Sequence, residues 1–419
     1  MNIEQLYKLY SQKYLVDTDT RKIRKGSIYF ALKGENFNGN KFAVEALNKG
    51  ANYAIVDEIK PNIHSKIIVV KNVLETLQQL ANFHRKKLNI PIISLTGSNG
   101  KTTTKELINS ILSQKYNTTA TIGNLNNHIG VPLTLLSMTP KTEIGVVEMG
   151  ANHLKEIEFL CAICEPNYGY ITNFGKAHLE GFGSVEGIIE GKSELYNFLR
   201  NTKGIAFLNE DDKIQLKQAT RTKSITFNKN IIQFIEANPF VKTQFKNTII
   251  ESNLIGKYNY NNIAAAIAIG NYFKISKESI KNAIENYIPT NNRSQIIEKG
   301  SAKIILDAYN ANPSSMLAAL ENFNQLKGDN KIVFLGDMFE LGNDSEKEHQ
   351  KIADLAISFN FKKVYLIGKA FSTTSVKKAF VYNSFEAFQT SNKYFKIDNT
   401  TILIKGSRGM ALERVLDLF

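Results

Sequence analysis

The chain has 419 residues, of which 43% are hydrophobic and 22% are charged, a composition typical of a globular protein with two or three domains. Its apolar runs, such as residues 263–269, are too short to cross a bilayer, and residues 1–10 lack the basic and then apolar order of a signal peptide. These features argue against an integral membrane protein, and we expect a cytoplasmic location.

The formal net charge of +13 raises the question of nucleic-acid binding. However, the lysines are spread along the chain rather than clustered. A cleft for a small polyanion would also favour a basic protein. We therefore expect small-molecule substrates and no nucleic-acid partner. Separately, we expect a monomer.

The first predicted region, residues 1–88, has the pattern of a small α/β domain. Apolar spacing predicts strands at residues 27–32, 53–57 and 66–70. The same criterion predicts helices at residues 41–49 and 73–86.

The second region, residues 89–289, begins with the sequence PIISLTGSNGKTTTKE at residues 91–106. Residues 92–95 suit a buried strand and residues 102–112 a helix, whose first amides face the loop between them. The loop and first helical turn consist of Gly97, Ser98, Asn99, Gly100, Lys101, Thr102 and Thr103. In a phosphate-binding loop, the lysine supplies charge to the terminal phosphates and the following threonine a hydroxyl to magnesium. The two glycines are closer together than in the standard motif, so a chance glycine turn is the alternative.

The rest of this region contains predicted strands at residues 145–148, 169–172 and 204–208. A helix-like run at residues 154–164 contains Cys161 and Cys164, whose CxxC spacing has no second pair. We therefore interpret both cysteines as core residues rather than as a redox or metal site. Residues 214–251 are too irregular to assign.

Several polar residues follow the predicted strands and turns. Asn124, Asn126 and Asn127 lie in GNLNNHIGVPLTLL, a turn that can donate hydrogen bonds to a phosphate or sugar, although such turns also form for local reasons. Glu148 ends a strand, where open α/β sheets collect ligands, and it either holds magnesium or is an ordinary capping or surface carboxylate. His178 follows the next strand as a metal ligand or, more commonly for a lone histidine, a structural residue.

Two helical segments carry further candidates. Lys192 in EGKSEL has the sequence context of a solvated helix lysine, but an amine that reacts with carbon dioxide becomes an anionic carbamate that can bind a metal. Asn259 and Asn262 in GKYNYNNIAAA are three residues apart on one helix face. They either reach a nucleotide base or cap the helix.

The third region, residues 290–419, follows a predicted helix at 277–287 and a turn-rich break, PTNN, at 289–292. Strands predicted at residues 303–306, 331–335, 363–367 and 401–404 alternate with helical segments, which implies a mostly parallel, doubly wound sheet. Polar turns after these strands contain Asp307, Asn310, Asp337, Glu340, Lys405 and Arg408. They indicate one edge of a cleft, although each turn also has an ordinary loop interpretation.

The short phosphate loop, Glu148, His178, Lys192 and the 259–262 helix occur in an order that resembles the Mur ligase family of ATP-dependent amide-forming enzymes. The resemblance covers nearly the whole chain. It implies an N-terminal UDP-binding domain, a central ATPase domain and a Rossmann-like C-terminal domain. The segment DTRKIRKGSIYFALKGENFNGNKF implies that Thr20, Arg21 and Lys33 contact the substrate. The family usually has histidine at the positions of Asn40 and Tyr258, so contacts through those rings are not transferred.

Within the family, DAYNANPSSM, LGDM with ELG, and KGSRGM most resemble the branch that joins D-alanyl-D-alanine to UDP-N-acetylmuramoyl-tripeptide. This implies that ATP phosphorylates the tripeptide carboxylate and that the dipeptide amine attacks the acyl phosphate. Thr102 would bind one Mg²⁺, and Glu148, His178 and carbamylated Lys192 a second. The implied nucleotide-binding residues include Asn259, Asn262, Arg293 and Asp307. The implied substrate residues, besides those of the N-terminal domain, are Asn124, Asn126, Asn127, Asn310, Lys405 and Arg408.

Three alternatives remain at this point. A sister ligase adds the third residue of the stem peptide, but its DNPR motif is absent from this sequence. Folate polyglutamylation is disfavoured by the UDP-type N-terminal segment. A protein that only binds nucleotide or nucleic acid would account for Lys101 but leaves Glu148, His178 and Lys192 without a role.

Overall fold

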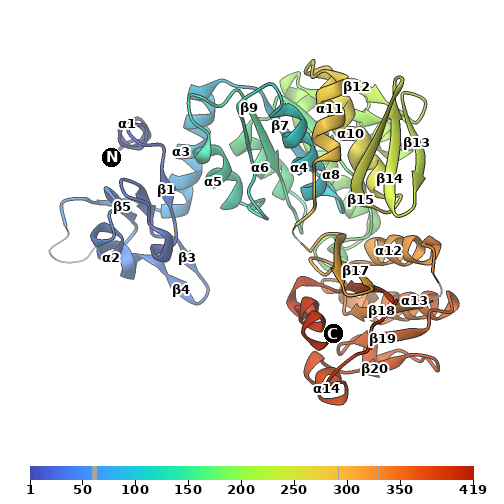
Figure 1. Cartoon of the computed structure of the whole chain (residues 1–419). Helices are drawn as coiled ribbons and strands as arrows, with labels where there is room; N and C mark the ends of the chain where they lie inside the picture. Colours follow the sequence, from blue (N-terminus) through green and yellow to red (C-terminus); the bar gives the residue numbers. More distant parts are fainter. Residues whose placement is uncertain (59–63, 291, 329) are drawn as a thin grey trace.

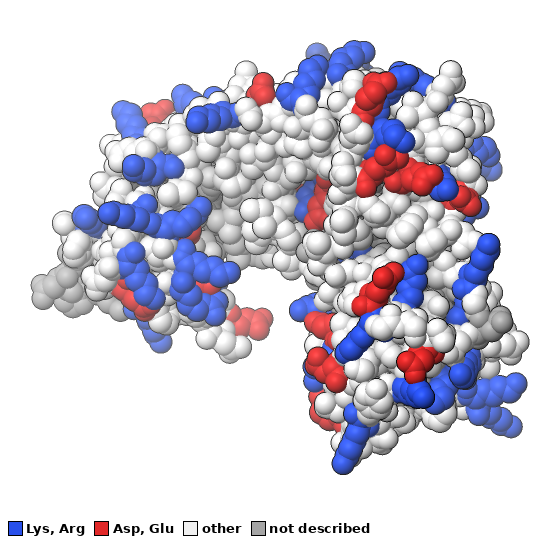
Figure 2. Space-filling view, in the orientation of Figure 1, with Lys and Arg blue, Asp and Glu red and all other residues white. Residues whose placement is uncertain are grey.

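A computed structural model describes residues 1–58, 64–290, 292–328 and 330–419 and shows three α/β domains in chain order (Figure 1). The N-terminal and C-terminal domains extend from opposite ends of the central one, and Figure 2 shows a wide hollow between them. No helix in the described part of the chain is both long and apolar enough to cross a membrane. The predicted three-domain α/β fold is confirmed.

The N-terminal domain is built on a parallel four-stranded sheet in the order β1-β2-β5-β6. Its strands are β1 (Val16–Asp17), β2 (Ile28–Phe30), β5 (Tyr53–Val56) and β6 (Ile67–Val69), with a separate hairpin of β3 (Lys33–Gly34) and β4 (Phe37–Asn38). Its helices are α1 (Ile3–Tyr10), α2 (Ala43–Asn48) and α3 (Val73–Leu88), with short 3₁₀ turns η1 (Thr20–Lys22) and η2 (Gly39–Phe42). The predicted strands and helices are confirmed, with ends shifted by a few residues.

The central domain is built on six parallel strands in the order β12-β11-β10-β7-β9-β8. They are β7 (Ile92–Thr96), β8 (Thr118–Ala120), β9 (Ile144–Glu148), β10 (Tyr168–Ile171), β11 (Ile205–Asn209) and β12 (Lys223–Phe227). Its helices are α4 (Lys101–Leu112), α5 (Gly130–Ser137), α6 (Glu156–Cys164), α7 (Leu179–Phe182), α8 (Val185–Thr202), α9 (Lys213–Gln218), α10 (Asn259–Tyr272) and α11 (Lys277–Glu285). Helices α4 and α10 share one apolar core, and α5, α6 and α8 belong to another that extends to α3. Cys161 and Cys164 are buried in the latter, as predicted.

Residues 214–251, which the sequence left unassigned, contribute to a second, antiparallel sheet. It consists of β13 (Ile232–Ala237), β14 (Phe240–Phe245) and β15 (Thr248–Ile255). Buried and half-buried residues alternate along β14, and Val241 and Phe245 join the core formed by α4 and α10. The sheet therefore packs on helix α10 and shares its apolar core with α4.

The C-terminal domain has a six-stranded sheet in the order β16-β17-β21-β18-β19-β20, in which only β16 is antiparallel. Its strands are β16 (Gln295–Lys299), β17 (Ala302–Asp307), β18 (Lys331–Gly336), β19 (Lys363–Ile367), β20 (Phe380–Tyr382) and β21 (Thr401–Lys405). Its helices are α12 (Pro313–Gln325), α13 (Ser345–Ser358) and α14 (Phe385–Ser391), with 3₁₀ turns η3 (Gly342–Asp344), η4 (Phe371–Thr373), η5 (Arg408–Met410) and η6 (Leu412–Leu418). The four predicted strands are confirmed. The predicted break at 289–292 includes residue 291, which lies outside the described residues.

Candidate active site

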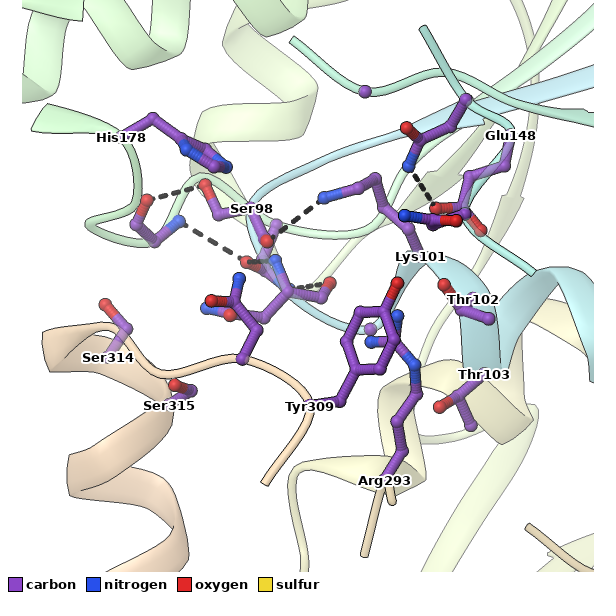
Figure 3. A pocket seen from close by; sticks show the side chains of 18 of the residues that line it. Ser98, Lys101, Thr102, Thr103, Glu148, His178, Arg293, Tyr309, Ser314 and Ser315 are labelled. Atoms are coloured by element: carbon purple, nitrogen blue, oxygen red, sulfur yellow. Dashed lines mark hydrogen bonds between the residues drawn. The ribbon is translucent and has the colours of Figure 1, made fainter. Parts of the chain in front are cut away.

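A cavity of about 720 Å³ lies between the central and C-terminal domains. The phosphate loop, the starts of α10 and α12, and the carboxyl ends of several strands line it (Figure 3). From the central domain it contains the predicted residues Ser98, Asn99, Gly100, Lys101, Thr102, Thr103, Asn124, Asn126, Asn127, Glu148, His178, Asn259 and Asn262. From the C-terminal domain it contains Arg293, Asp307, Asn310 and Lys405. The fold thus brings most of the predicted residues to one place.

The phosphate loop depends on its two glycines. Gly97 has a φ of +136°, and a Cβ there would lie 2.1 Å from Thr172 Oγ1. Gly100 has a φ of +81°, and a Cβ there would lie 2.4 Å from Asn262 Oδ1. The loop therefore adopts a conformation that other residues rarely reach, with its backbone pressed against neighbouring strand and helix residues. This geometry goes beyond what a chance surface turn requires.

Lys101 begins helix α4 and points back over this loop (Figure 3). Its Nζ donates hydrogen bonds to the carbonyl oxygens of Gly97 at 2.7 Å and Ser98 at 3.2 Å. Burial lowers the pKa of Lys101, the carboxylate of Glu148 partly opposes this shift, and the nearby Arg293 adds to it. Both cations increase the positive potential around the phosphate loop.

Glu148 ends strand β9 and is 1% exposed. Asn126 Nδ2 donates a hydrogen bond to Glu148 Oε1 at 2.8 Å. The other oxygen, Oε2, is buried and has no hydrogen-bond partner among the described residues. A buried carboxylate oxygen without a partner is costly unless a cation binds it, so Glu148 fits the role of a magnesium ligand.

His178 lies on the other side of the phosphate loop in Figure 3. Its Nδ1 contacts Glu340 Oε2 of the C-terminal domain, and this bond lowers the pKa of Glu340. In the ranges that the structure describes, no three His, Cys, Asp or Glu side chains are grouped to hold a metal. A second metal site with Glu148 and His178 would therefore need a further ligand.

Lys192 lies on α8 and is 0% exposed, so the interpretation of a solvated helix lysine is wrong. Its Nζ donates a hydrogen bond to the carbonyl of Ala151, a residue of the cavity wall, at 2.8 Å. Burial lowers the pKa of Lys192 well below its usual value, and Lys101 lowers it further. A neutral amine is the form that reacts with carbon dioxide.

The residues predicted for the nucleotide form a buried network beside the phosphate loop. Asn262 Nδ2 donates to Asn259 Oδ1 at 2.8 Å, and Asn262 Oδ1 accepts from Thr104 Oγ1 at 3.1 Å. Arg293 stacks on the ring of Tyr309, with its Cζ 3.6 Å from the ring centroid. This pair presents a flat surface at the cavity wall, of a kind that can stack against a base.

Lys405 and Arg408 are both already paired. Lys405 is 2% exposed, and its Nζ lies 2.5 Å from Asp307 Oδ2. Arg408 is not part of the cavity wall, and its Nη1 lies 2.6 Å from Glu413 Oε1. In this arrangement neither charge is free to hold a substrate carboxylate.

Asn312, which the sequence analysis did not select, connects the two domains. Its Nδ2 donates to Asn99 Oδ1 of the phosphate loop at 2.7 Å. Its Oδ1 accepts from the Ser315 amide at 2.9 Å and caps helix α12. The Asn-Pro pair was a signal for this helix start, but not for the contact with residue 99.

Three family models match the chain in order. They are the "Mur ligase family, catalytic domain" over residues 14–85, the "Mur ligase middle domain" over 95–270, and the "Mur ligase, glutamate ligase domain" over 292–408. A Bacillus subtilis protein named UDP-N-acetylmuramoyl-tripeptide--D-alanyl-D-alanine ligase is 35% identical, over 96% of this chain and 92% of its own length. The chain belongs to the Mur ligase family. An Escherichia coli protein of the same name is 34% identical over the same shares of the two chains.

Solved structures of other Mur ligases have the same architecture. MurF from Acinetobacter baumannii matches with a TM-score of 0.85 and 29% identity, over 99% of this chain and 97% of that one. MurF from Thermotoga maritima, in complex with ADP, matches with a TM-score of 0.84 and 26% identity, over 97% and 96% of the two chains. The similarity extends over all three domains of this Mur ligase.

The N-terminal domain of this Mur ligase carries Thr20, Arg21 and Lys33 away from the cavity. Arg21 pairs with Asp19, and Lys33 Nζ lies 2.9 Å from Asp57 Oδ1. Asn40, where the family usually has histidine, exchanges hydrogen bonds with Asp57 at 2.9 and 3.0 Å. Its role here is to fix Asp57 in place.

The second departure from the family pattern, Tyr258, lines the cavity. Its hydroxyl lies 2.7 Å from Ser294 Oγ. Burial raises the pKa of Tyr258. It therefore stays neutral and connects the start of α10 to the C-terminal domain.

We expect Asn312→Asp to lower kcat/KM for ATP by roughly three- to tenfold, the scale of one net hydrogen bond. An aspartate retains the oxygen that caps α12 but loses the amide that donates to Asn99. Steady-state kinetics with ATP as the varied substrate would measure this. Asn312→Ala, which removes the cap as well, should also lower the melting temperature. Unchanged kcat/KM in the aspartate variant would contradict the coupling.

Proposed function

We propose that this Mur ligase joins D-alanyl-D-alanine to UDP-N-acetylmuramoyl-tripeptide with consumption of ATP. The observation that carries the proposal is that one cavity is lined by Lys101, by Glu148 with its unpartnered oxygen, and by residues of the C-terminal domain. The names of the near-full-length relatives support the identity of the two substrates.

In the proposed reaction, the terminal carboxylate of the tripeptide attacks the γ-phosphate of ATP, which gives an acyl phosphate and ADP. The dipeptide amine then attacks the acyl carbon, and phosphate leaves as the amide forms. Lys101 and the first amides of α4 would stabilise the phosphate charge in both steps. The contacts between the phosphate loop and α12 would help exclude water from the acyl phosphate.

The donor set fits Mg²⁺, since Thr102 begins the helix after the loop and Glu148 offers its unpartnered oxygen. When bound, the ion would neutralise charge on the phosphates and on the developing oxyanion. His178 would offer Nε2, because its Nδ1 already contacts Glu340. Asn126 would hold the Glu148 carboxylate toward the cavity.

We further propose that Lys192 is carbamylated. Its amine would attack carbon dioxide, lose a proton and become a carbamate anion. The buried position and lowered pKa of Lys192 support this, because both favour the neutral, nucleophilic amine. The carbamate would supply the further ligand that Glu148 and His178 lack.

The remaining assignments are part of the same proposal. We place the domain limits at 1–88, 89–289 and 290–419, which the three matched segments support. Thr20, Arg21 and Lys33 would bind the UDP end of the substrate from across the hollow seen in Figure 2. Because ATP and a UDP-linked precursor are cytoplasmic metabolites, we also propose a cytoplasmic location.

We expect Lys192→Ala to lose most of its turnover and to regain part of it when formate or acetate is added. A small carboxylate can enter the space that the lysine side chain leaves and replace the anionic group. Turnover would be measured across a carboxylate series with chloride as the ionic-strength control. If the alanine variant is fully active without additives, the carbamate assignment is wrong.

The decisive test measures ADP release with ATP and Mg²⁺ for two acceptor classes. One reaction contains UDP-N-acetylmuramoyl-tripeptide and D-alanyl-D-alanine, and the others contain nucleotide precursors with single amino acids. Release that requires the dipeptide is the expected result. Release only with a diamino acid and the shorter precursor would indicate the sister ligase.

A further inference from the structure

Two residues at the entry to the C-terminal domain have an unusual backbone conformation. Asn292 has a φ of +51° and Ser294 a φ of +53°. Both lie just before β16, where the chain passes from the central domain into the C-terminal one. Asparagine tolerates this left-handed conformation, but serine rarely adopts it, because its Cβ crowds the following carbonyl oxygen. Such a conformation persists where neighbouring groups hold it in place.

Ser294 is hydrogen-bonded to both domains and is 5% exposed. Its Oγ lies 2.7 Å from the hydroxyl of Tyr258, which stands at the start of α10 in the central domain. Its backbone amide donates to Asp307 Oδ1, at the end of β17 in the C-terminal domain, at 3.1 Å. We call Tyr258, Ser294 and Asp307 the linker clamp, because one serine joins the two domains through them.

Both outer members of the linker clamp are themselves fixed. The ring of Tyr258 lies close to Gly256, where a Cβ would be 2.4 Å from Tyr258 Cε1. Asp307 Oδ2 is 2.5 Å from Lys405 Nζ, which also donates to the Asn310 carbonyl at 3.2 Å. The conformation of Ser294 is therefore set from two sides by groups that have little freedom to move.

Arg293 lies between the two residues with positive φ. Its guanidinium packs on the ring of Tyr309 (Figure 3). Its Nε is buried and has no hydrogen-bond partner among the described residues. Arg293 and all three members of the linker clamp line the cavity between the central and C-terminal domains. A backbone rotation at Ser294 would therefore move Arg293 and release the Ser294 amide from Asp307.

We infer that Tyr258 and Ser294 are positioning residues for the nucleotide. The linker clamp holds Arg293 and Asp307 in the arrangement that binds the nucleotide, so that neither Tyr258 nor Ser294 has to contact it. This inference rests on the proposed function, in which Arg293 and Asp307 serve ATP. It also gives Tyr258, which stands where the family usually has histidine, a role of its own in this chain.

The first test compares Tyr258→Phe with Tyr260→Phe as a matched control. Tyr260 is also on α10 and donates its hydroxyl to the Ile232 carbonyl, but it is not among the described residues of the cavity wall. Calorimetry with ADP and Mg²⁺ should give a Kd about three- to tenfold higher in Tyr258→Phe, the scale of one net hydrogen bond. Tyr260→Phe should bind ADP like the wild type. An unchanged Kd in Tyr258→Phe overturns the inference.

Two further readouts separate positioning from a general loss of stability. Both tyrosine variants lose one hydroxyl hydrogen bond, so we expect similar, modest decreases in melting temperature. In turnover assays, the KM for ATP should rise in Tyr258→Phe, while the KM for D-alanyl-D-alanine stays the same. A parallel loss of ADP affinity in both variants would mean that the hydroxyl of Tyr258 acts only through stability, which contradicts the inference.

The second test uses the backbone conformation of Ser294. Ser294→Ala keeps the strained backbone but loses the hydroxyl, and we expect the Kd for ADP to rise about tenfold. Ser294→Gly also loses the hydroxyl, but glycine adopts positive φ freely and needs no clamp, so its Kd should rise less. If alanine is harmless, or if glycine raises the Kd as much as alanine does, the inference is wrong.

The third test combines Tyr258→Phe with Ser294→Ala. Because the two hydroxyls form one hydrogen bond, the double variant should have a Kd for ADP close to that of the weaker-binding single variant. Multiplication of the two single effects would show independent roles and overturn the inference. These affinities decide the linker clamp whether or not the wild type forms an amide, and absence of amide product contradicts the ligase proposal alone. A wild type that does not bind ADP would overturn both.

Discussion

Replacing Lys101 with alanine should lower turnover at least about 10²-fold, the scale expected for loss of one preorganised charge at a developing anion. In the structure Lys101 Nζ is held by the Gly97 and Ser98 carbonyls, so it is positioned before a phosphate arrives. Its lowered pKa reflects burial above all, with a smaller contribution from Arg293, and a phosphate would relieve that cost. ADP release under saturating substrates would measure the loss.

Two further variants separate this charge effect from damage to the fold. Lys101→Arg keeps the charge but cannot place a compact ammonium between the loop carbonyls, so we expect only partial recovery. Lys115→Ala removes an exposed lysine just after the other end of α4 and should leave turnover unchanged. Near-normal turnover of a folded Lys101→Ala protein would remove the phosphate-loop assignment.

The sequence was sufficient for the parts of this fold that repeat a local pattern. An apolar strand, a glycine loop and a helix in direct succession predicted the phosphate loop, and β7 and α4 have these positions. Alternating strands and helices likewise predicted the C-terminal sheet. Residues 214–251 resisted assignment because, apart from β12, their strands belong to an antiparallel sheet whose packing surface, α10, comes later in the chain.

Pairings across long distances were beyond the sequence. Asn99 and Asn312 are 213 residues apart, and nothing in either local pattern indicates that they meet. Lys405 was chosen for its charge, but only the fold reveals that Asp307 on the neighbouring strand neutralises it. The burial of Lys192 is similar, because its helix has an ordinary surface pattern until α6 and α7 cover it.

The second large effect is expected for Glu148→Gln. Glutamine preserves the shape of the side chain and keeps an oxygen that accepts from the Asn126 amide. It carries no charge, however, and its NH₂ group takes the place of Oε2, the oxygen without a hydrogen-bond partner among the described residues. If Glu148 holds Mg²⁺, loss of this ligand removes several kcal/mol of charge stabilisation. Turnover should then fall about 10²- to 10³-fold, and the Mg²⁺ concentration for half-maximal turnover should rise.

The matched control is Glu143→Gln, an exposed carboxylate just before the opposite end of the same strand. It should change neither turnover nor the Mg²⁺ requirement, because its carboxylate binds the Asn117 amide far from the sheet edge that faces the cavity. A Glu148→Gln protein that is slow but has an unchanged Mg²⁺ requirement would indicate that Glu148 only positions Asn126. If the Glu148→Gln protein has both normal turnover and an unchanged Mg²⁺ requirement, the buried oxygen of Glu148 has another partner. The metal must then be held by Thr102 and the phosphates alone.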